Sequence, residues 1–398
     1  MTKKPSYRFV DYTEPWVEKK LGDVSTITMG QSPNSENYTD NPNDYILVQG
    51  NADMKNGRVF PRVWTTQITK QARQGDLILS VRAPVGDIGK TDYDVVLGRG
   101  VASIDGNEFL YQALSQMKQN GYWSKLSTGS TFESINSNDI KSAIISLPSL
   151  PEQTAIGSFF QDIDQLISIQ QRKLEVLKEQ KKTYLKLLFP AKGQTKPALR
   201  FAGFEDDWKE VKLGEVGETY TGLSGKTKED FGHGEGKFIT YVNVFNNPLT
   251  DLYGLDSVEI DDKQRRVQYG DVLFTTSSET PEDVGLSSVW MGTEDNVYLN
   301  SFCFGYRPQK GIFNLYYLAF VLRSFSVRKE FMLLAQGISR FNISKTKVMD
   351  MSIHVPSLPE QEAIGSFFQD LDKAIAKQEE KVNQLKESKQ TLLRKMFI

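Results

Sequence analysis

The chain has 398 residues, of which 39% are hydrophobic and 25% charged, and its formal net charge is −2. This composition is that of a globular protein, and the length predicts at least two domains. The single cysteine, Cys303, excludes an internal disulfide, and with only His233 and His354 beside it no Cys/His zinc cluster can be assembled.

The first residues carry no targeting signal. "MTKKPSYRFVDYTEPW" lacks the apolar core of a signal peptide, and the sequence has no run of about 18 apolar residues. We therefore expect a cytoplasmic protein without a membrane segment. The near-zero net charge speaks against a protein that binds nucleic acid by bulk charge alone, so any basic surface must come from the arrangement of charges or from a partner.

Two segments near the start of the chain recur in its second half. "YRFVDYTEPWVEKKLGDV" at 7–24 aligns without gaps on "LRFAGFEDDWKEVKLGEV" at 199–216. We name these the leading segments. "QGDLILS" at 74–80 likewise recurs as "YGDVLFT" at 269–275.

The interiors of the two copies are less alike. Short apolar runs such as "DLILSV" and "DVLFTT", bounded by Gly, Pro, Asn and Asp, predict compact sheet-rich α+β modules. Yet "VRAPVGDIGKTDYDVV" in the first copy faces "TSSETPEDVGLSSVW" in the second. Symmetric parts suit a repeated partner, whereas divergent parts suit two different ligands, and DNA is the ligand whose own dyad matches such a duplicated chain.

A closer repeat follows each domain. "PSLPEQTAIGSFFQD" at 148–162 and the segment at 356–370 are identical except where Thr154 faces Glu362. The sequence is therefore a tandem duplication. Ser149 and Glu152 have capping-box spacing with Pro between them, which predicts a helix start.

Beyond this start, both copies follow the heptad spacing of a coiled-coil seam. The predicted seam residues are Ile156, Phe160, Ile163, Ile167, Gln170, Leu174 and Leu177 in the first copy, and Ile364, Phe368, Leu371, Ile375, Gln378, Val382 and Leu385 in the second. Both seams are interrupted by Gln and then by Lys, at Gln170 and Lys181 and at Gln378 and Lys389. Helices of about 60 Å are too long for their own domains to cover, so we expect each to cover the other.

A duplicated unit pairs with its duplicate about a pseudo-two-fold axis, which predicts antiparallel helices. Gln170 and Gln378 are then expected opposite each other near the centre, where they would fix the register. The predicted organisation is a first domain at 1–146, a helix at 147–190, a second domain at 191–354 and a helix at 355–398. Phe159 and Phe367, beside the seam, leave apolar surface for either a recognition domain or a partner.

The repeated "LPSLPEQxAIGSFFQDxD", the leading "FxxxxxxWxxxKLG(D/E)V", "RAPVGDIG" and "STGST" resemble the specificity subunit of type I restriction-modification systems. The resemblance covers essentially the whole chain. It implies two pseudo-symmetric α+β target-recognition domains joined by an antiparallel coiled coil, each domain reading one half of a bipartite, asymmetric double-stranded DNA site. The second domain departs from this pattern in two places, with "TPEDVG" for "APVGDIG" and "AQGISRFNIS" for "STGSTFESIN".

The resemblance also implies partners and cofactors. The helices are expected to set the spacer and to dock two methyltransferase (modification) subunits, which translocase/nuclease (restriction) subunits join. This chain is expected to be non-catalytic and to bind no metal or cofactor, whereas S-adenosylmethionine, ATP and Mg belong on the partner subunits.

Other functions fit the residues less well. "SGKT" at 224–227 and "GKT" at 89–91 lack the glycine that a P-loop needs, because Tyr220 and Pro84 stand there. Glu235-Gly236-Lys237 has the spacing of part of a nuclease site but no upstream Asp on an apolar strand. The alternative to DNA reading is a structural coiled-coil adaptor that holds two partner subunits.

Candidate DNA contacts are basic and hydroxyl side chains in the polar turns of each domain, because these groups bond phosphates and base edges. In the first domain they are Lys55, Arg58, Arg62, Lys70, Arg73, Arg82, Arg99 and Lys125, with Thr128, Ser130 and Thr131 of a hydroxyl-rich loop. In the second they are Lys226, Lys228, Lys237, Arg265, Arg266, Arg340 and Lys345. Arg82, between a strand end and a Pro/Gly turn, is the first choice in its domain, with an internal ion pair to Asp76 or Asp87 as the alternative.

Arg340 is the first choice in the second domain, because it occupies the counterpart of the hydroxyl-rich loop. Replacing Arg340 with Ala is expected to weaken DNA binding by about 1–3 kcal/mol if it reads a base. Equilibrium binding to the recognised duplex measures this, and unchanged affinity together with unchanged site preference would remove Arg340 from the candidates.

Overall fold

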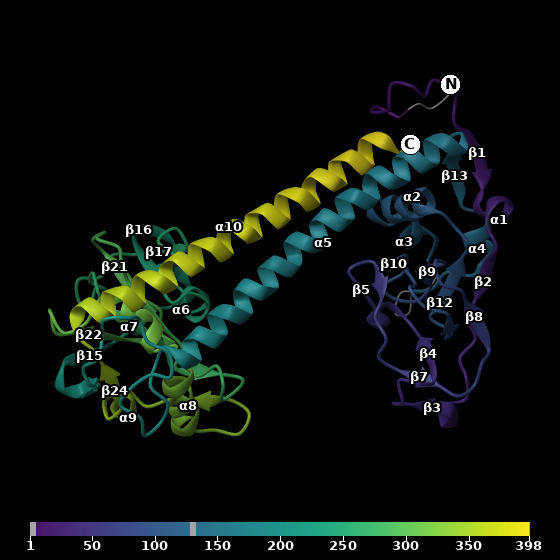
Figure 1. Ribbon diagram of the computed structural model, residues 1–398. Coiled ribbons are helices and arrows are strands. Elements are labelled where there is room, and N and C mark those ends of the chain that lie inside the picture. The colour runs from purple at the N-terminus through teal and green to yellow at the C-terminus, as the bar shows by residue number, and fades with distance from the viewer. Residues whose placement is uncertain (1–4, 128–132, 398) are drawn as a thin grey trace. The chain divides into compact units, whose positions relative to one another are not determined.

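The computed structural model describes residues 5–127 and 133–397. It divides into two compact units (Figure 1). Unit 1 comprises residues 1–172 and 379–398, and unit 2 comprises residues 173–378. Each unit mixes helices with sheets, which confirms the predicted α+β class. The predicted boundaries of the four segments stay a prediction, because each unit takes part of both long helices.

The described residues of unit 1 form three sheets. The leading strand β1 (Val17–Lys20) pairs antiparallel with β13 (Ile144–Leu147). A six-stranded sheet has the order β2 (Ile27–Met29), β12 (Val101–Ile104), β9 (Leu77–Ser80), β10 (Ile88–Lys90), β6 (Arg58–Val59) and β5 (Met54–Lys55). A five-stranded sheet has the order β3 (Tyr38–Thr39), β7 (Trp64–Thr65), β4 (Tyr45–Val48), β11 (Val95–Leu97) and β8 (Lys70–Ala72).

Unit 2 repeats this plan with differences. β14 (Lys209–Lys212) pairs with β24 (Ser352–Val355) as β1 pairs with β13. A four-stranded sheet has the order β15 (Gly217–Thr221), β22 (Cys303–Pro308), β18 (Val272–Thr275) and β20 (Ser287–Val289). The smaller sheets are β17 (Leu255–Val258), β16 (Phe231–Ile239) and β21 (Val297–Leu299), and the pair β19 (Ser277–Ser278) and β23 (Phe341–Asn342).

Short helices cover these sheets. Those of unit 1 are α1 (Leu21–Val24), α2 (Glu108–Gln119), α3 (Tyr122–Leu126) and α4 (Ser137–Lys141). Those of unit 2 are α6 (Tyr241–Asn246), α7 (Leu315–Val321), α8 (Phe325–Leu334) and α9 (Lys345–Met349). The long helices are α5 (Leu150–Leu187) and α10 (Leu358–Met396).

The central strands of the two units have matching register. β9 and β18 are buried along their whole length, as the apolar runs predict. Ser80 of β9 faces Val101 of β12, and Thr275 of β18 faces Cys303 of β22. These pairings let each exposed residue of one domain be matched to its counterpart in the other.

A buried carboxylate joins each leading segment to its long helix. In unit 1 the Glu152 side chain accepts bonds from Arg8 Nε at 2.6 Å and from Trp16 Nε1 at 3.3 Å. In unit 2 Glu360 accepts from Arg200 Nε at 2.7 Å and from Trp208 Nε1 at 3.3 Å. Both carboxylates are completely buried, at 0% and 1% exposure.

This clamp changes the role predicted for Glu152. Its capping-box spacing suggested that the carboxylate would bond backbone donors at the helix start. Among the described residues its side-chain partners are Arg8 and Trp16 instead. The planar Arg8 guanidinium donates to both oxygens of the Glu152 carboxylate, and this two-bond pairing takes the place of the expected bond to a backbone donor.

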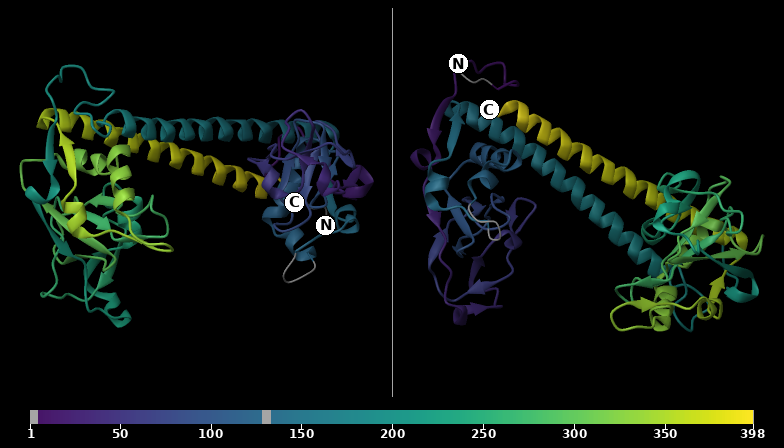
Figure 2. Two further views of the ribbon diagram at one scale, coloured as in Figure 1. Left: turned by 90° about the horizontal axis from the view of Figure 1, so that it is seen from below. Right: turned by 180° about the vertical axis from the view of Figure 1, so that it is seen from behind.

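The long helices run antiparallel within each unit (Figure 2). In unit 1 the ring of Phe160 lies 5.9 Å from that of Phe397, and further along α5 Asp164 accepts a bond from Lys389 at 2.6 Å. The α10 residue number therefore falls as the α5 number rises.

Unit 2 has the same arrangement. Lys181 pairs with Asp372 at 2.5 Å, and further along α5 the ring of Tyr184 lies 5.0 Å from that of Phe367. The two seam lysines, at corresponding positions of the repeat, thus each bind an aspartate of the other copy.

The predicted seam matches the burial of both helices. Each of its residues is buried or half-buried, whereas most residues between them are exposed. Gln378 is among the buried polar residues at 6% exposure. Because Gln170 and Gln378 belong to different units, their expected juxtaposition stays a prediction.

Phe159 and Phe367 contact the leading segments. Phe159 packs edge to face against Phe9 at 5.8 Å, and Phe367 packs against Phe201 at 5.7 Å. Of the two alternatives for this apolar surface, the structure therefore favours the chain's own domains.

The two units anchor their domains on the long helices differently. In unit 1, where α2 packs on α5 (Figure 1), buried Gln112 donates to Glu108 at 3.0 Å and to Asp164 at 2.9 Å. In unit 2 the stacked rings of Phe320 and Phe368, 4.9 Å apart, join α7 to α10. The buried glutamine contact of unit 1 and the ring stacking of unit 2 thus differ between the two copies.

The clamp predicts a large stability effect. Replacing Glu360 with Ala should lower the free energy of unfolding of unit 2 by about 3–5 kcal/mol, because it leaves the Arg200 guanidinium without its buried partner. Denaturant unfolding followed by tryptophan fluorescence measures the change. The matched control is Glu362→Ala in the same helical turn, whose side chain is exposed and should matter by less than about 0.5 kcal/mol. Equal effects of the two variants would contradict the clamp.

Candidate nucleic-acid interface

Three of the predicted arginines line one hollow of unit 1. Arg62, Arg82 and Arg99 surround a groove of about 640 Å³. We name it the basic groove. Its other lining residues are Ser32, Tyr38, Gln49, Gly50, Asn51, Ala52, Asp53, Val63, Ser80, Ala83, Pro84 and Gly100. The three arginines are exposed, so the fold gathers positive charge from distant parts of a nearly neutral sequence.

Arg99 lies in the turn that leads from β11 to β12, where the two larger sheets of unit 1 meet. The Gly98 amide donates to Val48 O at 2.7 Å, and the Arg99 amide donates to Ser32 Oγ at 3.1 Å. A Cβ at Gly100 would lie 2.1 Å from the carbonyl oxygen of Gln49. Only glycine permits this close approach, so the backbone on both sides of Arg99 is fixed.

Arg82 follows β9 and is also held by its backbone. It forms an isolated antiparallel bridge with Ser134, and Ser80 Oγ donates to its carbonyl at 2.9 Å. The alternative of an internal ion pair finds no support among the described residues, because Asp87 pairs with Lys118 and Asp76 accepts the Arg73 amide. The Arg82 guanidinium therefore has no acidic partner in the described parts of the chain.

Arg62 differs, because a carboxylate lies beside it. Asp53 is buried and accepts the amides of Gln49 and Gly50 at 2.7 and 3.2 Å. Its other oxygen lies 3.7 Å from Arg62 Nε, and Arg62 also donates to Ala52 O at 3.1 Å. Among the described residues, the groove thus carries two unpaired arginines and one that is partly neutralised.

The other candidates of the first domain lie outside the groove. Arg58 pairs with Asp92, and Lys55 lies over the Phe60 ring at 5.8 Å. The side chains of Lys70, Arg73 and Lys125 are exposed or half-buried. Thr128, Ser130 and Thr131 fall outside the described residues.

Arg340 lies on a short loop of unit 2. Gln336 and Asn342 exchange backbone hydrogen bonds of 2.9 and 2.8 Å, and Ile338 at the tip is 98% exposed. Past the loop, Ile343 N bonds Thr276 O at 2.9 Å, as Ile135 N bonds Val81 O at 3.0 Å in unit 1. Ile343 and Ile135 therefore occupy corresponding places in the two units.

The remaining candidates of unit 2 are partly engaged within the domain. Lys226 is largely buried and pairs with Asp261 at 3.0 Å, a bond that raises its pKa. Lys237 donates to Ser257 at 2.8 Å, and Arg266 pairs with Asp262. The other three are Lys228 and Arg265, which are exposed, and Lys345, which is half-buried.

The matching register identifies what unit 2 has in place of the basic groove arginines. Arg82 corresponds to Ser277, which bridges Asn342 as Arg82 bridges Ser134. Arg99 corresponds to Ser301, followed by Phe302, which is 57% exposed. The sequence did not predict these positions, which are Ser277, Ser301 and Phe302. They can be aligned with the arginines of unit 1 only through the strand register, which the structure supplies.

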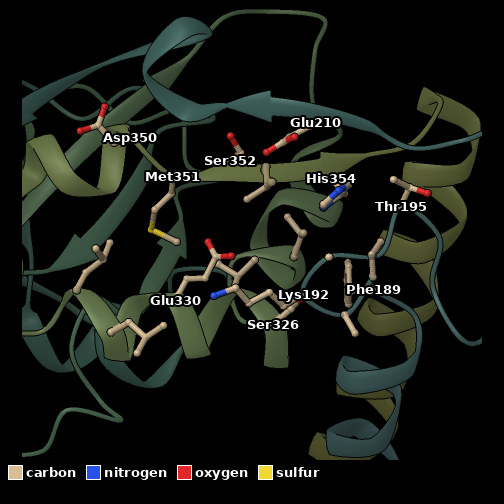
Figure 3. Close-up of a pocket in the computed structure, with 18 of the residues that line it drawn as sticks. Phe189, Lys192, Thr195, Glu210, Ser326, Glu330, Asp350, Met351, Ser352 and His354 are labelled. Atoms are coloured by element: carbon tan, nitrogen blue, oxygen red, sulfur yellow. The ribbon is translucent and has the colours of Figure 1, made fainter.

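A second hollow, of about 620 Å³, lies in unit 2 between α8, β24 and residues 189–195 (Figure 3). Glu330, Lys192, Glu210 and His354 are among the residues that line it. Burial raises the pKa of Glu330, and the nearby Lys192 and His354 oppose this rise. The hollow is lined by both acidic and basic side chains, so its charge does not favour an anionic ligand such as DNA.

The described residues hold neither a metal cluster nor a membrane span. No three His, Cys, Asp or Glu side chains among residues 5–127 and 133–397 are grouped so that they could bind a metal ion. In the same part of the chain, every helix is too short or too polar to cross a bilayer.

Family and sequence comparisons agree with one another. The model of the type I restriction modification DNA specificity domain matches twice, at residues 13–179 and 205–387. The putative type I restriction enzyme MjaX specificity subunit of Methanocaldococcus jannaschii is 34% identical over 191 residues, which are 46% of this chain and 44% of that protein. The MjaVIII specificity subunit of the same organism is 26% identical over 275 residues, which are 63% of this chain and 60% of that protein. The chain thus spans about half the length of the curated relatives it matches.

Solved structures share the fold. The type I restriction-modification S subunit of M. genitalium superposes with a TM-score of 0.59 at 15% identity, covering 100% of this chain and 99% of that one. A chain from a study of complex assembly and conformational transition of the type I R-M system also gives 0.59, at 20% identity, covering 97% and 98%.

The Glu330 hollow predicts a pH-dependent stability. A carboxyl whose pKa is raised by folding destabilises the protein once pH exceeds its usual value of about 4.3, and the effect is complete above the raised pKa. Glu330→Gln should therefore raise the free energy of unfolding at pH 7. We expect a gain of about 0.5 kcal/mol, because Glu330 is half-buried and solvent screens its charge. The gain should vanish below about pH 4. Thermal unfolding at both pH values measures it, with exposed Glu235→Gln as control. A gain that persists at low pH would contradict this account.

Proposed function

Because the chain belongs to the family of type I restriction-modification DNA specificity domains, we propose that it is the subunit that selects the DNA sequence in a type I restriction-modification complex. Each recognition domain reads one half of a bipartite, asymmetric site. The observation that carries this proposal is the matched register of the two domains. The same backbone positions carry Arg82 and Arg99 in the first domain and Ser277 and Ser301 in the second.

The chemistry of these positions suits DNA. Arginine and serine both bond phosphates and base edges, but with different preferences. A structural adaptor that reads no DNA would have no use for unpaired arginines in a groove. Ser277 is buried, so Arg99 and Ser301 are the matched pair in which both side chains are exposed. Two domains with one backbone plan and different side chains at such a position suit two different half-sites, as an asymmetric site requires.

The long helices suit the spacing role. Each long helix has a lysine that binds an aspartate of the other helix, Lys181 with Asp372 and Lys389 with Asp164. Both ion pairs therefore require the same register between α5 and α10. We propose that these helices set the unread spacer and dock two methyltransferase subunits, which translocase/nuclease subunits join.

We assign catalysis to the partners. The methyltransferase subunits would bind S-adenosylmethionine, and the restriction subunits ATP and Mg. This chain would contribute the DNA contacts, in the cytoplasm where the DNA lies. Its near-zero net charge of −2 predicts that the partners add phosphate contacts, so assembly should steepen the salt dependence of binding.

A domain exchange tests the proposal. Residues 191–354 would be replaced by the second recognition domain of a relative, and the chain would be assembled with its methyltransferase subunits. Methylation mapping of a genome that carries the complex should show one half of the target changed and the other half kept. The matched control is a chain with exposed Lys182 replaced by Ala, which should keep both halves. An unchanged target after the exchange would favour the adaptor.

A further inference from the structure

We infer that Arg99 reads a guanine in the half-site of the first domain, and that the second domain has no guanine reader at the matching position. This inference rests on the proposed function and deepens it. It assigns a base class to one residue and predicts that the two half-sites differ in their need for guanine there.

The first step is the equivalence of position. In unit 1, Gly30 N bonds Val101 O at 3.0 Å, and in unit 2 Gly222 N bonds Cys303 O at 3.3 Å. The turns that precede Val101 and Cys303 therefore occupy corresponding places in the two units. The first turn is Gly-Arg-Gly and presents Arg99, and the second is Asn-Ser-Phe and presents Ser301. A position that corresponds in the two folds but carries a different side chain is where sequence preference can differ.

The second step is rigidity. Both neighbours of Arg99 are glycines packed against Gln49, and backbone atoms of Gln49 occupy the space that a side chain would need: a Cβ at Gly98 would lie 3.0 Å from Gln49 Cα. The Arg99 amide is bonded to Ser32 Oγ. A side chain that starts from a fixed backbone loses less conformational freedom on binding. Direct readout of a base requires a more precisely positioned side chain than a phosphate contact does.

The third step is charge. Asp53 partly neutralises Arg62, whereas Arg99 has no ion pair with any described residue. The Asp53 carboxylate is buried at 5% exposure, and its oxygens are engaged by the Gln49 and Gly50 amides and by Arg62. The donors of the exposed Arg99 side chain are therefore available to a ligand. Guanine offers O6 and N7 to such a side chain.

The choice of guanine follows from the arginine itself. The guanidinium has donors only, in a planar fork that matches the two acceptors of guanine. Adenine presents a donor beside N7, which an arginine cannot satisfy with the same fork. Ser301, with one hydroxyl, bonds either kind of base edge and distinguishes them weakly.

The test uses the chain assembled with its methyltransferase subunits and a duplex carrying the mapped target. Each guanine of the first half-site is replaced in turn by 7-deazaguanine, which lacks the N7 acceptor. One replacement should weaken binding by about tenfold to hundredfold. Arg99→Ser should make binding insensitive to that replacement. Arg99→Lys keeps the charge and a donor that can reach N7, and should keep part of the sensitivity. Exposed Lys19→Ser serves as the control and should keep the sensitivity.

The outcomes separate the inference from the proposed function. If Arg99→Ser weakens binding equally for all duplexes and lowers the salt slope by about one, Arg99 binds a phosphate and the inference is overturned, while the function stands. If 7-deazaguanine has no effect at any position of the first half-site, the inference is likewise overturned. If the unaltered complex binds all duplexes equally and methylates no defined sequence, the proposed function itself fails.

Discussion

The structure depends on one buried interaction that occurs twice. A carboxylate at the start of each long helix, Glu152 or Glu360, is removed from water and held by an arginine and a tryptophan of the leading segment. A buried charge is tolerated only when it is fully paired, so this contact admits little variation in geometry. It fixes the position of the leading segment relative to the start of the long helix. The strands that follow the leading segment are positioned by this contact.

That constraint explains why the scaffold and the reading surface could diverge independently. The clamp, β1 with β13 and β14 with β24 lie where domain and helix join. The exposed turns, with Arg99 in one domain and Ser301 in the other, lie outside this joint. A substitution at these turns changes what the surface can bond without disturbing the joint. Stability and preference thus belong to separate residues.

The sequence predicts the periodic parts well and the long-range polar contacts poorly. The heptad spacing located both helices and the burial of Phe160 and Phe368, because apolar periodicity reports directly which face is covered. The clamp was missed because Arg8 lies 144 positions before Glu152, and no local pattern connects them. Lys226 stays a predicted DNA contact, and its pairing with Asp261 could not be predicted, because it depends on how two loops meet. Of the groove, the arginines were predictable as residue types. Their gathering around Asp53 depends on strand order, which spacing along the chain does not give.

The composition of unit 1 has a consequence for folding during synthesis. Unit 1 joins residues 1–172 to residues 379–398, whereas unit 2 is continuous from 173 to 378. The first domain can close its clamp as soon as Glu152 has been made, but Leu393 and Met396, which are buried in its core cluster, are translated more than two hundred residues later. A chain emerging from the ribosome therefore completes its second unit before its first. Until then the early half of α5 keeps an uncovered apolar side, the kind of transient surface that chaperones bind.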